Sequence, residues 1–457
     1  MEEPRERRAM LNQSFSPENF RWIFDYENRR GVYLEGKFFP DIAEVTESIK
    51  QCMATIRGLR KKKRVWLPEY YELQKSILNE EKINLFKKKE GLLTKELETI
   101  SAEAGSSGYS ITVRSVPIPG GKMAYATDNS PTSYFVIKQL QSNIRQLYKV
   151  KQSSRHEIIC QLREMLGDPF PKLVIRTDIE DFYESIPQSQ LLVKLEQDAM
   201  LASPSRRVLR QILAAYSDLT GKLTGIPRGI GISAYLSELY IRRFDEAIRA
   251  HDSVIYYARY VDDIVIIFSL RPNSSISRFL PFVKKQAAVL GLSLNKDKTS
   301  RHVLKNRRAC LFEYLGYKIG FGDGPVVLNL SDKRKTKYKN RIKRSFDAYR
   351  KQSRFDEKRA RRILIKRVAF LTGNTRLLNN KDNIMVGTYF SNCLLTNAKD
   401  FQSLDESLKA RIRAIGPVSL RRVLGQYSFE QGFLQRQYHE FTTKELEYIV
   451  RLWKHEA

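Results

Sequence analysis

The sequence contains few of the residues that build disulfide frameworks and zinc sites. Its five histidines and four cysteines are scattered without paired spacing; the cysteines are Cys52, Cys160, Cys310 and Cys393. Zinc sites and disulfide frameworks place such residues at short, recurring spacings, so this pattern argues against a His/Cys metal site. We therefore expect a reduced, cytoplasmic protein.

Long apolar runs are also missing. No stretch approaches the ~20 consecutive apolar residues that span a bilayer. Residues 1–8 are charged and no apolar run follows them, which differs from a secretory signal. We expect no membrane partner.

Positive charge, by contrast, is in large excess. The 457 residues include 80 Lys and Arg against 51 Asp and Glu, a formal net charge of +29. With 42% hydrophobic and 11% aromatic residues, the composition is that of a globular protein with room for several domains. A single-sign excess raises self-repulsion in the folded state, so it favours a nucleic-acid partner over a merely soluble basic surface.

The first hundred residues carry a helical, heavily charged pattern. Residues 16–100 contain two basic clusters, at 60–64 and 87–89. Such clusters are either solvated helix faces or nucleic-acid contacts, and the sequence leaves both interpretations open. The small, flexible residues 101–108 then indicate a linker or loop.

The middle of the chain mixes strand and helix patterns. Residues 109–116 alternate like a strand, and residues 119–122 (Pro-Gly-Gly-Lys) predict the turn of a hairpin. Two helical patterns follow, around 133–148 and 155–166. Over residues 172–320, short apolar runs alternate with helical stretches, which predicts an α+β domain with a buried sheet.

Residues 331–367 are intensely basic and helical in pattern. Tyr338, Ile342, Phe346 and Tyr349 fall on one face of the expected helix, and lysines and arginines occupy the others. The rest of the chain is helical in pattern without a recognisable motif.

Two acidic sites point to metal chemistry. Asp262 and Asp263 lie between two apolar β-like runs, so they are expected in the tight turn of a hairpin. Asp178 follows the apolar run 173–175 and is expected at the end of a strand. Clustered carboxylates repel one another unless a cation offsets them, and hard oxygen ligands suit magnesium. Two ions about 4 Å apart would support in-line phosphoryl transfer.

Five segments resemble the sequence motifs of reverse transcriptases and occur in the family's order. Residues 178–183 (Asp-Ile-Glu-Asp-Phe-Tyr) resemble motif A, and residues 260–263 (Tyr-Val-Asp-Asp) resemble motif C. Residues 225–233 are similar to motif B, 291–299 to motif D, and 312–317 to motif E, the primer grip. The family commonly has Pro-Gln-Gly in motif B, where this chain has Pro-Arg-Gly.

The resemblance implies roles for individual residues in motifs A and C. Asp178, Asp262 and Asp263 match the family's ligands for two Mg²⁺ ions, and the Ile179 carbonyl is the expected fourth oxygen. Tyr183 stands at the steric gate, whose ring excludes the 2′-hydroxyl that separates ribonucleotides from deoxynucleotides. The alternative for Tyr183 is an ordinary core aromatic.

Further roles follow for motifs B and D. Gly229 would let the backbone approach the incoming base pair closely. Arg228 replaces the usual Gln, so template and nucleotide discrimination are expected to differ from typical members. Lys298 is the expected acid for pyrophosphate release, with Lys296 as the alternative.

The segment before motif A is similar to bacterial reverse transcriptases. It makes Arg155 the expected triphosphate contact, with Arg145 and Lys151 as competing candidates. The basic helix after motif E would be the thumb, which tracks a duplex backbone by charge without reading sequence.

The resemblance implies an α+β fold of the right-hand polymerase type, with fingers, a palm built on an antiparallel sheet and a helical thumb. The expected domains are a helical N-terminal region (1–108), fingers (109–171), palm (172–325) and a basic helical thumb with a C-terminal extension (326–457).

The implied activity is RNA-directed DNA synthesis with Mg²⁺, an RNA template, deoxynucleoside triphosphates and a DNA product. The residues after motif A and within motif B look most like bacterial defence-associated (antiviral) reverse transcriptases, in particular the smaller enzyme of type 3 systems. That group implies a dedicated non-coding RNA and assembly into a larger complex, with a second reverse transcriptase or as a homo-oligomer. A retron-type enzyme is one alternative, and a catalytically weak RNA-binding scaffold is another.

Overall fold

The chain folds into two compact units, each assembled from segments that are distant in the sequence. The computed structural model describes residues 11–62, 65–118, 121, 123–151, 153–271, 275–305, 309–322, 324–377 and 384–453. Unit 1 comprises residues 1–116, 124–150 and 188–236, and unit 2 comprises 117–123, 151–187 and 237–457. Lys63 and Arg64 of the first basic cluster, and three of the four residues of the predicted turn at 119–122, lie outside the described residues.

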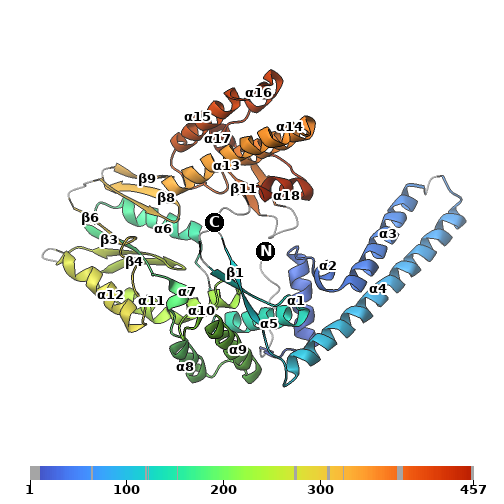
Figure 1. Cartoon of the computed structure of the whole chain (residues 1–457), viewed down its shortest axis with the longest axis horizontal. Helices are drawn as coiled ribbons and strands as arrows, with labels where there is room; N and C mark the ends of the chain where they lie inside the picture. Colours follow the sequence, from blue (N-terminus) through green and yellow to red (C-terminus); the bar gives the residue numbers. More distant parts are fainter. Residues whose placement is uncertain are drawn as a thin grey trace. The chain divides into compact units, whose positions relative to one another are not determined.

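Unit 1 is mainly helical (Figure 1). Its helices are α1 (Pro17–Arg29), α2 (Leu34–Phe38), α3 (Pro40–Lys62), α4 (Pro68–Gly105), α5 (Pro131–Leu147), α8 (Gln188–Asp198), α9 (Ser203–Thr220) and the first half of α10 (Ile232–Tyr240). Helices α3 and α4 lie side by side, which confirms the helical pattern predicted over residues 16–100. Prolines stand in the first turn of α1, α4, α5 and α9, where a missing N–H is harmless.

A short two-stranded sheet, β1 (Val113–Pro117) with β2 (Met123–Thr127), follows the helical pair. The predicted strand at 109–116 therefore begins four residues late. The physical reason lies at Tyr109, whose ring is buried and whose carbonyl accepts a hydrogen bond from the Gln211 side chain at 3.0 Å. Tyr109 is thus held by α9 instead of by a strand partner.

Unit 2 is built on a four-stranded antiparallel sheet with the order β4-β5-β3-β6. The strands are β3 (Lys172–Asp178), β4 (Val254–Tyr260), β5 (Asp263–Ser269) and β6 (Ser300–Leu304). One face shares a core with α6 (Arg155–Gly167), and the other packs on α11 (Arg242–Arg249) and α12 (Phe279–Val289). The sheet and its helices confirm the predicted α+β class.

A second antiparallel sheet, β7-β8-β9, contacts α6 and joins the same core. Its strands are β7 (Cys310–Tyr314), β8 (Tyr317–Gly322) and β9 (Gly324–Leu330). The other elements of unit 2 are α7 (Phe182–Ser185), the 3-10 helix η1 (Ile276–Arg278), α13 (Asp332–Gln352), α14 (Glu357–Thr372), β10 (Asn374–Arg376), β11 (Met385–Gly387), α15 (Lys399–Arg413), α16 (Val418–Leu424), α17 (Phe429–Leu434) and α18 (Thr443–Arg451).

The basic helical region predicted over residues 331–367 consists of two helices. Helix α13 ends at Gln352, and α14 begins after Asp356, whose carboxylate accepts the Arg359 backbone N–H at 2.9 Å. Such a cap stabilises the start of a new helix. The predicted apolar face of the first helix is confirmed, because Ile342, Phe346 and Tyr349 are buried.

Within the described residues, no helix is both long and apolar enough to span a membrane. The division into four domains stays a prediction.

Candidate active site

The two adjacent acids lie in the hairpin that joins β4 to β5, as predicted. Tyr260 pairs with Asp263, so Val261 and Asp262 form the turn. Val261 has φ +59°, and two-residue hairpins need positive φ at this position. A β-branched residue is strained there, so the surrounding structure must hold the turn in place.

The third acid comes from the neighbouring strand. Asp178 pairs with Asp263 across β3 and β5, and residues paired in this way point to the same face of a sheet. The Ile179 N–H donates to the Asp262 carbonyl at 3.2 Å and fastens the turn to the end of β3. Carboxylate oxygens of Asp178, Asp262 and Asp263 all lie within 4.8 Å of one another.

The pKa of Asp263, one of the three clustered acids, lies above its usual value. Burial is the main cause, and the carboxylates of Asp262 and Asp178 add to it, while Arg176 and Lys298 oppose the rise. Arg176 Nη2 lies 3.2 Å from Asp263 Oδ1. Three carboxylates in one partly buried spot fit a hard divalent cation such as Mg²⁺, since the cation would offset their repulsion.

The Lys298 side chain contacts this carboxylate cluster. Its Nζ donates to both carboxylate oxygens of Asp178, at 3.0 and 2.9 Å. Burial lowers the pKa of Lys298, but the hydrogen bond to Asp178 and the nearby carboxylates outweigh burial, so the pKa is raised. The loop that carries Lys298 is tied to β3, because the Asn295 N–H donates to the Asp178 carbonyl at 2.8 Å and the Thr299 and Thr177 hydroxyls are 2.8 Å apart.

A buried ion network around Arg259, at the end of β4, was not predicted from the sequence. The Arg259 side chain is 6% exposed and donates bidentately to Glu238, at 2.9 and 2.7 Å, and to Asp245, at 2.9 and 2.8 Å. Arg259 Nη1 also donates to the Val261 carbonyl at 2.8 Å, so it holds the strained turn. Its place directly before Tyr260 was the one sequence signal.

Tyr183, the last residue of motif A, lies in α7. The helix begins after Asp181, which has φ +41°. Phe182 is 1% exposed and belongs to the core, whereas Tyr183 is half-buried with its ring centroid 5.9 Å from that of Phe182. The core-aromatic alternative therefore describes Phe182 better than Tyr183.

Arg155, the expected triphosphate contact, lies against the primer-grip segment. Its guanidinium is 5.3 Å from the Tyr317 ring centroid, and that of Arg334 is 5.7 Å from the same ring. A Cβ added to Gly316, in the β7–β8 turn, would lie 3.0 Å from Arg155 Nη2. Burial and the charge of Arg334 lower the pKa of Arg155. The triphosphate role stays a prediction.

The motif B residues belong to unit 1. The Tyr125 N–H donates to the Arg228 carbonyl at 2.6 Å. Gly229 has φ +104°, and a Cβ there would lie 2.7 Å from the Tyr125 carbonyl oxygen. Strand β2 therefore requires glycine at position 229; an approach to a base pair stays a prediction.

Comparison with protein families adds a direct result. Residues 128–319 match the family described as "Reverse transcriptase (RNA-dependent DNA polymerase)". The chain carries a reverse transcriptase domain. The matched segment contains all three aspartates of the cluster.

Solved structures similar to this chain include three telomerases. Apo telomerase from Candida tropicalis truncated from its C-terminal domain is 16% identical over 48% of this chain and 55% of that chain, with a TM-score of 0.35. Telomerase from Candida albicans in complex with a TWJ fragment of telomeric RNA is 12% identical over 77% of this chain and 62% of that chain, with a TM-score of 0.34. Apo telomerase from Candida tropicalis is 13% identical over 77% of this chain and 63% of that chain, with a TM-score of 0.38. The chain spans less than two thirds of each of these proteins. A comparison with curated proteins gave no match.

Proposed function

We propose that the chain uses two magnesium ions to add deoxynucleotides to a primer 3′-hydroxyl on an RNA template. The observation that carries this proposal is the cluster of Asp178, Asp262 and Asp263, whose oxygens lie within 4.8 Å of one another inside a reverse transcriptase domain. Clustered carboxylates are costly to keep together without a cation, which argues against a scaffold that has lost catalysis.

The three aspartates, with the Ile179 carbonyl, would hold the ions in this proposal. Bound there, the ions would activate the 3′-hydroxyl and stabilise the leaving pyrophosphate. Lys298 Nζ, which is kept protonated by its raised pKa, would give its proton to the pyrophosphate oxygen. Its ion pair with Asp178 must open when the aspartate takes up a cation.

The roles proposed for the residues that would contact the nucleotide rest on the positions of these residues in the motifs. The Tyr183 ring would exclude a 2′-hydroxyl, and its half-buried state leaves part of the ring accessible. Arg228 and Gly229 would contact the template and the incoming base pair. Arg155 would neutralise a phosphate, because its Nε and Nη2 atoms are buried and lack a hydrogen-bond partner among the described residues.

For the biological role we propose bacterial antiviral defence, in the cytoplasm, with a dedicated non-coding RNA as template. The support is the likeness of residues 183–186 (Tyr-Glu-Ser-Ile) and 226–229 (Ile-Pro-Arg-Gly) to defence-associated enzymes. A second reverse transcriptase or further copies of this chain would complete the complex. A retron-type reverse transcriptase is the alternative within the same activity.

The deciding experiment uses protein purified together with its RNA. The protein is incubated with Mg²⁺ and each labelled deoxynucleotide, alone and in combination, beside Asp262→Ala/Asp263→Ala and the control Asp252→Ala, an exposed acid in the loop before β4. We expect DNA from the wild type and the control alone, and none after ribonuclease pretreatment. Equal synthesis by the double variant would refute the metal site, and synthesis that survives ribonuclease would refute the RNA template.

The defence role is tested in a bacterial host challenged with phage. Protection by the wild type that is lost in the double variant supports the proposal. Protection that persists in the double variant would favour the scaffold alternative.

A further inference from the structure

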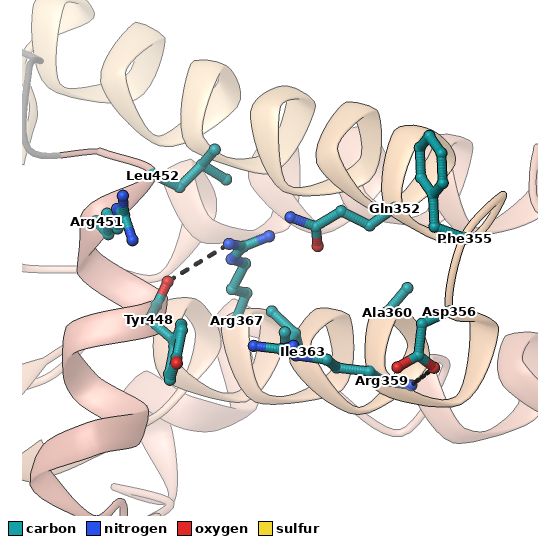
Figure 2. Close-up of a pocket in the computed structure, with 10 residues that line it drawn as sticks. All are labelled: Gln352, Phe355, Asp356, Arg359, Ala360, Ile363, Arg367, Tyr448, Arg451 and Leu452. Carbon is teal, nitrogen blue, oxygen red and sulfur yellow. Dashed lines mark hydrogen bonds between the residues drawn. The ribbon is translucent and has the colours of Figure 1, made fainter.

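A groove of about 570 Å³ lies in the C-terminal part of unit 2, far along the sequence from the aspartate cluster. It is formed by the end of α13, by α14 and by α18 (Figure 2). Its volume falls within the range of about 300–1,000 Å³ that is typical of ligand sites. The apolar lining includes Ala360, Ile363 and Leu452.

The groove contains a buried cation, the guanidinium of Arg367. Arg367 is 6% exposed, and burial lowers its pKa. Its Nη2 donates to the Tyr448 carbonyl at a long 3.4 Å, and its Nε has no hydrogen-bond partner in the part of the chain that the structure describes. Within the described residues, no carboxylate pairs with it. A buried, unpaired charge is costly, so a site that keeps one is prepared for an anion.

The charges around Arg367 reinforce this preference. Arg359 and Arg451 line the same groove, and the Arg359 guanidinium lies 5.7 Å from the Tyr448 ring centroid. Asp356 is the acid in the lining, but its carboxylate caps α14 by accepting the Arg359 backbone N–H. The groove lining therefore contains three guanidinium groups and one carboxylate, and that carboxylate is already engaged.

Aromatic rings at the rim identify the kind of anion. Phe355 is 92% exposed and Tyr448 is 48% exposed, although both line the groove. Figure 2 shows the Arg367 side chain between Tyr448 on one side and Gln352 on the other, with Phe355 beyond Gln352. Exposed rings beside guanidinium groups suit bases of single-stranded nucleic acid, which stack on aromatic faces while cations hold their phosphates. An acidic protein side chain would leave these rings without a role.

We propose that this groove binds a nucleotide, with its phosphate on Arg367 and its base against Phe355 or Tyr448. The nucleotide is either part of a single-stranded RNA or free in solution. The inference deepens the proposed function, since it rests on RNA being bound by the chain, but it requires neither Mg²⁺ nor synthesis.

The test cross-links short single-stranded RNA that contains 4-thiouridine to the full chain, without Mg²⁺ or deoxynucleotides, and maps the linked peptides by mass spectrometry. We expect links at Phe355 or Tyr448 in the wild type, and at least about tenfold less in Arg367→Met and in Phe355→Ala, because a stacked base or a charge-assisted phosphate contact is lost. Arg354→Met, an exposed arginine of the α13–α14 turn, and Phe170→Ala, a ring that is 72% exposed, are the matched controls. Excess adenosine monophosphate distinguishes the sources, since it removes the links if the groove takes a free nucleotide.

Folding does not confuse the result. Arg367→Met replaces an unpaired buried charge with an apolar side chain, so its melting temperature should equal or exceed that of the wild type. Asp262→Ala/Asp263→Ala should cross-link normally, which separates this proposal from failure of the polymerase site. Links that are equally strong in Arg367→Met and the wild type would overturn the proposal, as would an Arg367-dependent binding of poly-glutamate without any RNA effect.

Discussion

Replacing Arg259 should separate the stability of unit 2 from the geometry of the β4–β5 turn that carries Asp262. The guanidinium is 6% exposed and makes two hydrogen bonds each to Glu238 and Asp245, whose side chains are 12% and 10% exposed. A fifth hydrogen bond reaches the carbonyl of Val261. One side chain therefore neutralises two buried acids and holds one strained turn.

The expected loss of stability in Arg259→Met follows from the charges that remain buried after the substitution. Glu238 and Asp245 would stay buried with their main counter-charge gone, and breaking a buried ion pair costs about 3–5 kcal/mol. That is a large share of the roughly 5–15 kcal/mol that stabilises a typical domain. The Val261 carbonyl also loses its donor, and a displacement of about 1 Å at a catalytic group is able to lower kcat about 10²-fold.

Urea unfolding and hydrogen exchange of peptides covering β4 and β5 measure the stability, and primer extension measures kcat. Arg259→Met should unfold at a urea concentration lower by about 1 M or more, with faster exchange in both strands. Arg243→Met, an exposed arginine on the same helix as Asp245, should change neither.

A combined variant, Arg259→Met/Glu238→Met/Asp245→Leu, sharpens the test. Removing the acids with the arginine should restore most of the stability, because apolar replacement of a whole buried ion network is often neutral or favourable. The turn still lacks its donor, so kcat should stay low. Unchanged unfolding of Arg259→Met, or full activity of the combined variant, would show that the reasoning is wrong.

Three further substitutions probe the site. Lys298→Met removes the cation that occupies Asp178, so half-maximal activity should need less Mg²⁺ in a metal titration, while kcat falls about 10²-fold because the proton donor is gone; an unchanged kcat would contradict the donor role. Gly229→Ala places a Cβ 2.7 Å from the Tyr125 carbonyl oxygen, at a φ of +104°. We therefore expect the free energy of unfolding, measured in urea, to fall by about 1–3 kcal/mol. Wild-type stability would mean that β2 moves aside at little cost. Tyr183→Ala should admit ribonucleotides at least about tenfold better in primer extension, as a contact with the 2′-hydroxyl requires, and unchanged discrimination would exclude the gate.

The clustering of Asp178, Asp262 and Asp263 was predictable because their neighbours in the sequence are unusual. Adjacent acids between two apolar runs repel each other in a strand hairpin unless a cation binds there. The apolar run before Asp178 indicates a strand end. Antiparallel pairing of β3 with β5 then brings Asp178 opposite Asp263. The order of the five motifs indicated a resemblance to reverse transcriptases, and the family match over residues 128–319 supports that resemblance.

The supporting residues could not be found in this way. Glu238 and Asp245 lie 21 and 14 residues from Arg259 on other elements, and each alone is an ordinary helix acid. Pairings of this kind depend on packing, which periodicity does not report. The position of Arg155 beside Tyr317 likewise follows from the contact of α6 with β8.

The two buried arginines of unit 2 show why satisfaction of hydrogen bonds matters more than burial. Arg259 and Arg367 are each about as buried as the core, yet the first donates to two carboxylates and a carbonyl while the second has one long bond to a carbonyl. A satisfied guanidinium stabilises the fold, and an unsatisfied one lowers stability until a ligand arrives. The same Arg→Met change should therefore lower the melting temperature at position 259 and leave it equal or higher at 367. If both variants lost stability equally, Arg367 would have a structural partner after all, and the nucleotide groove would lose its main support.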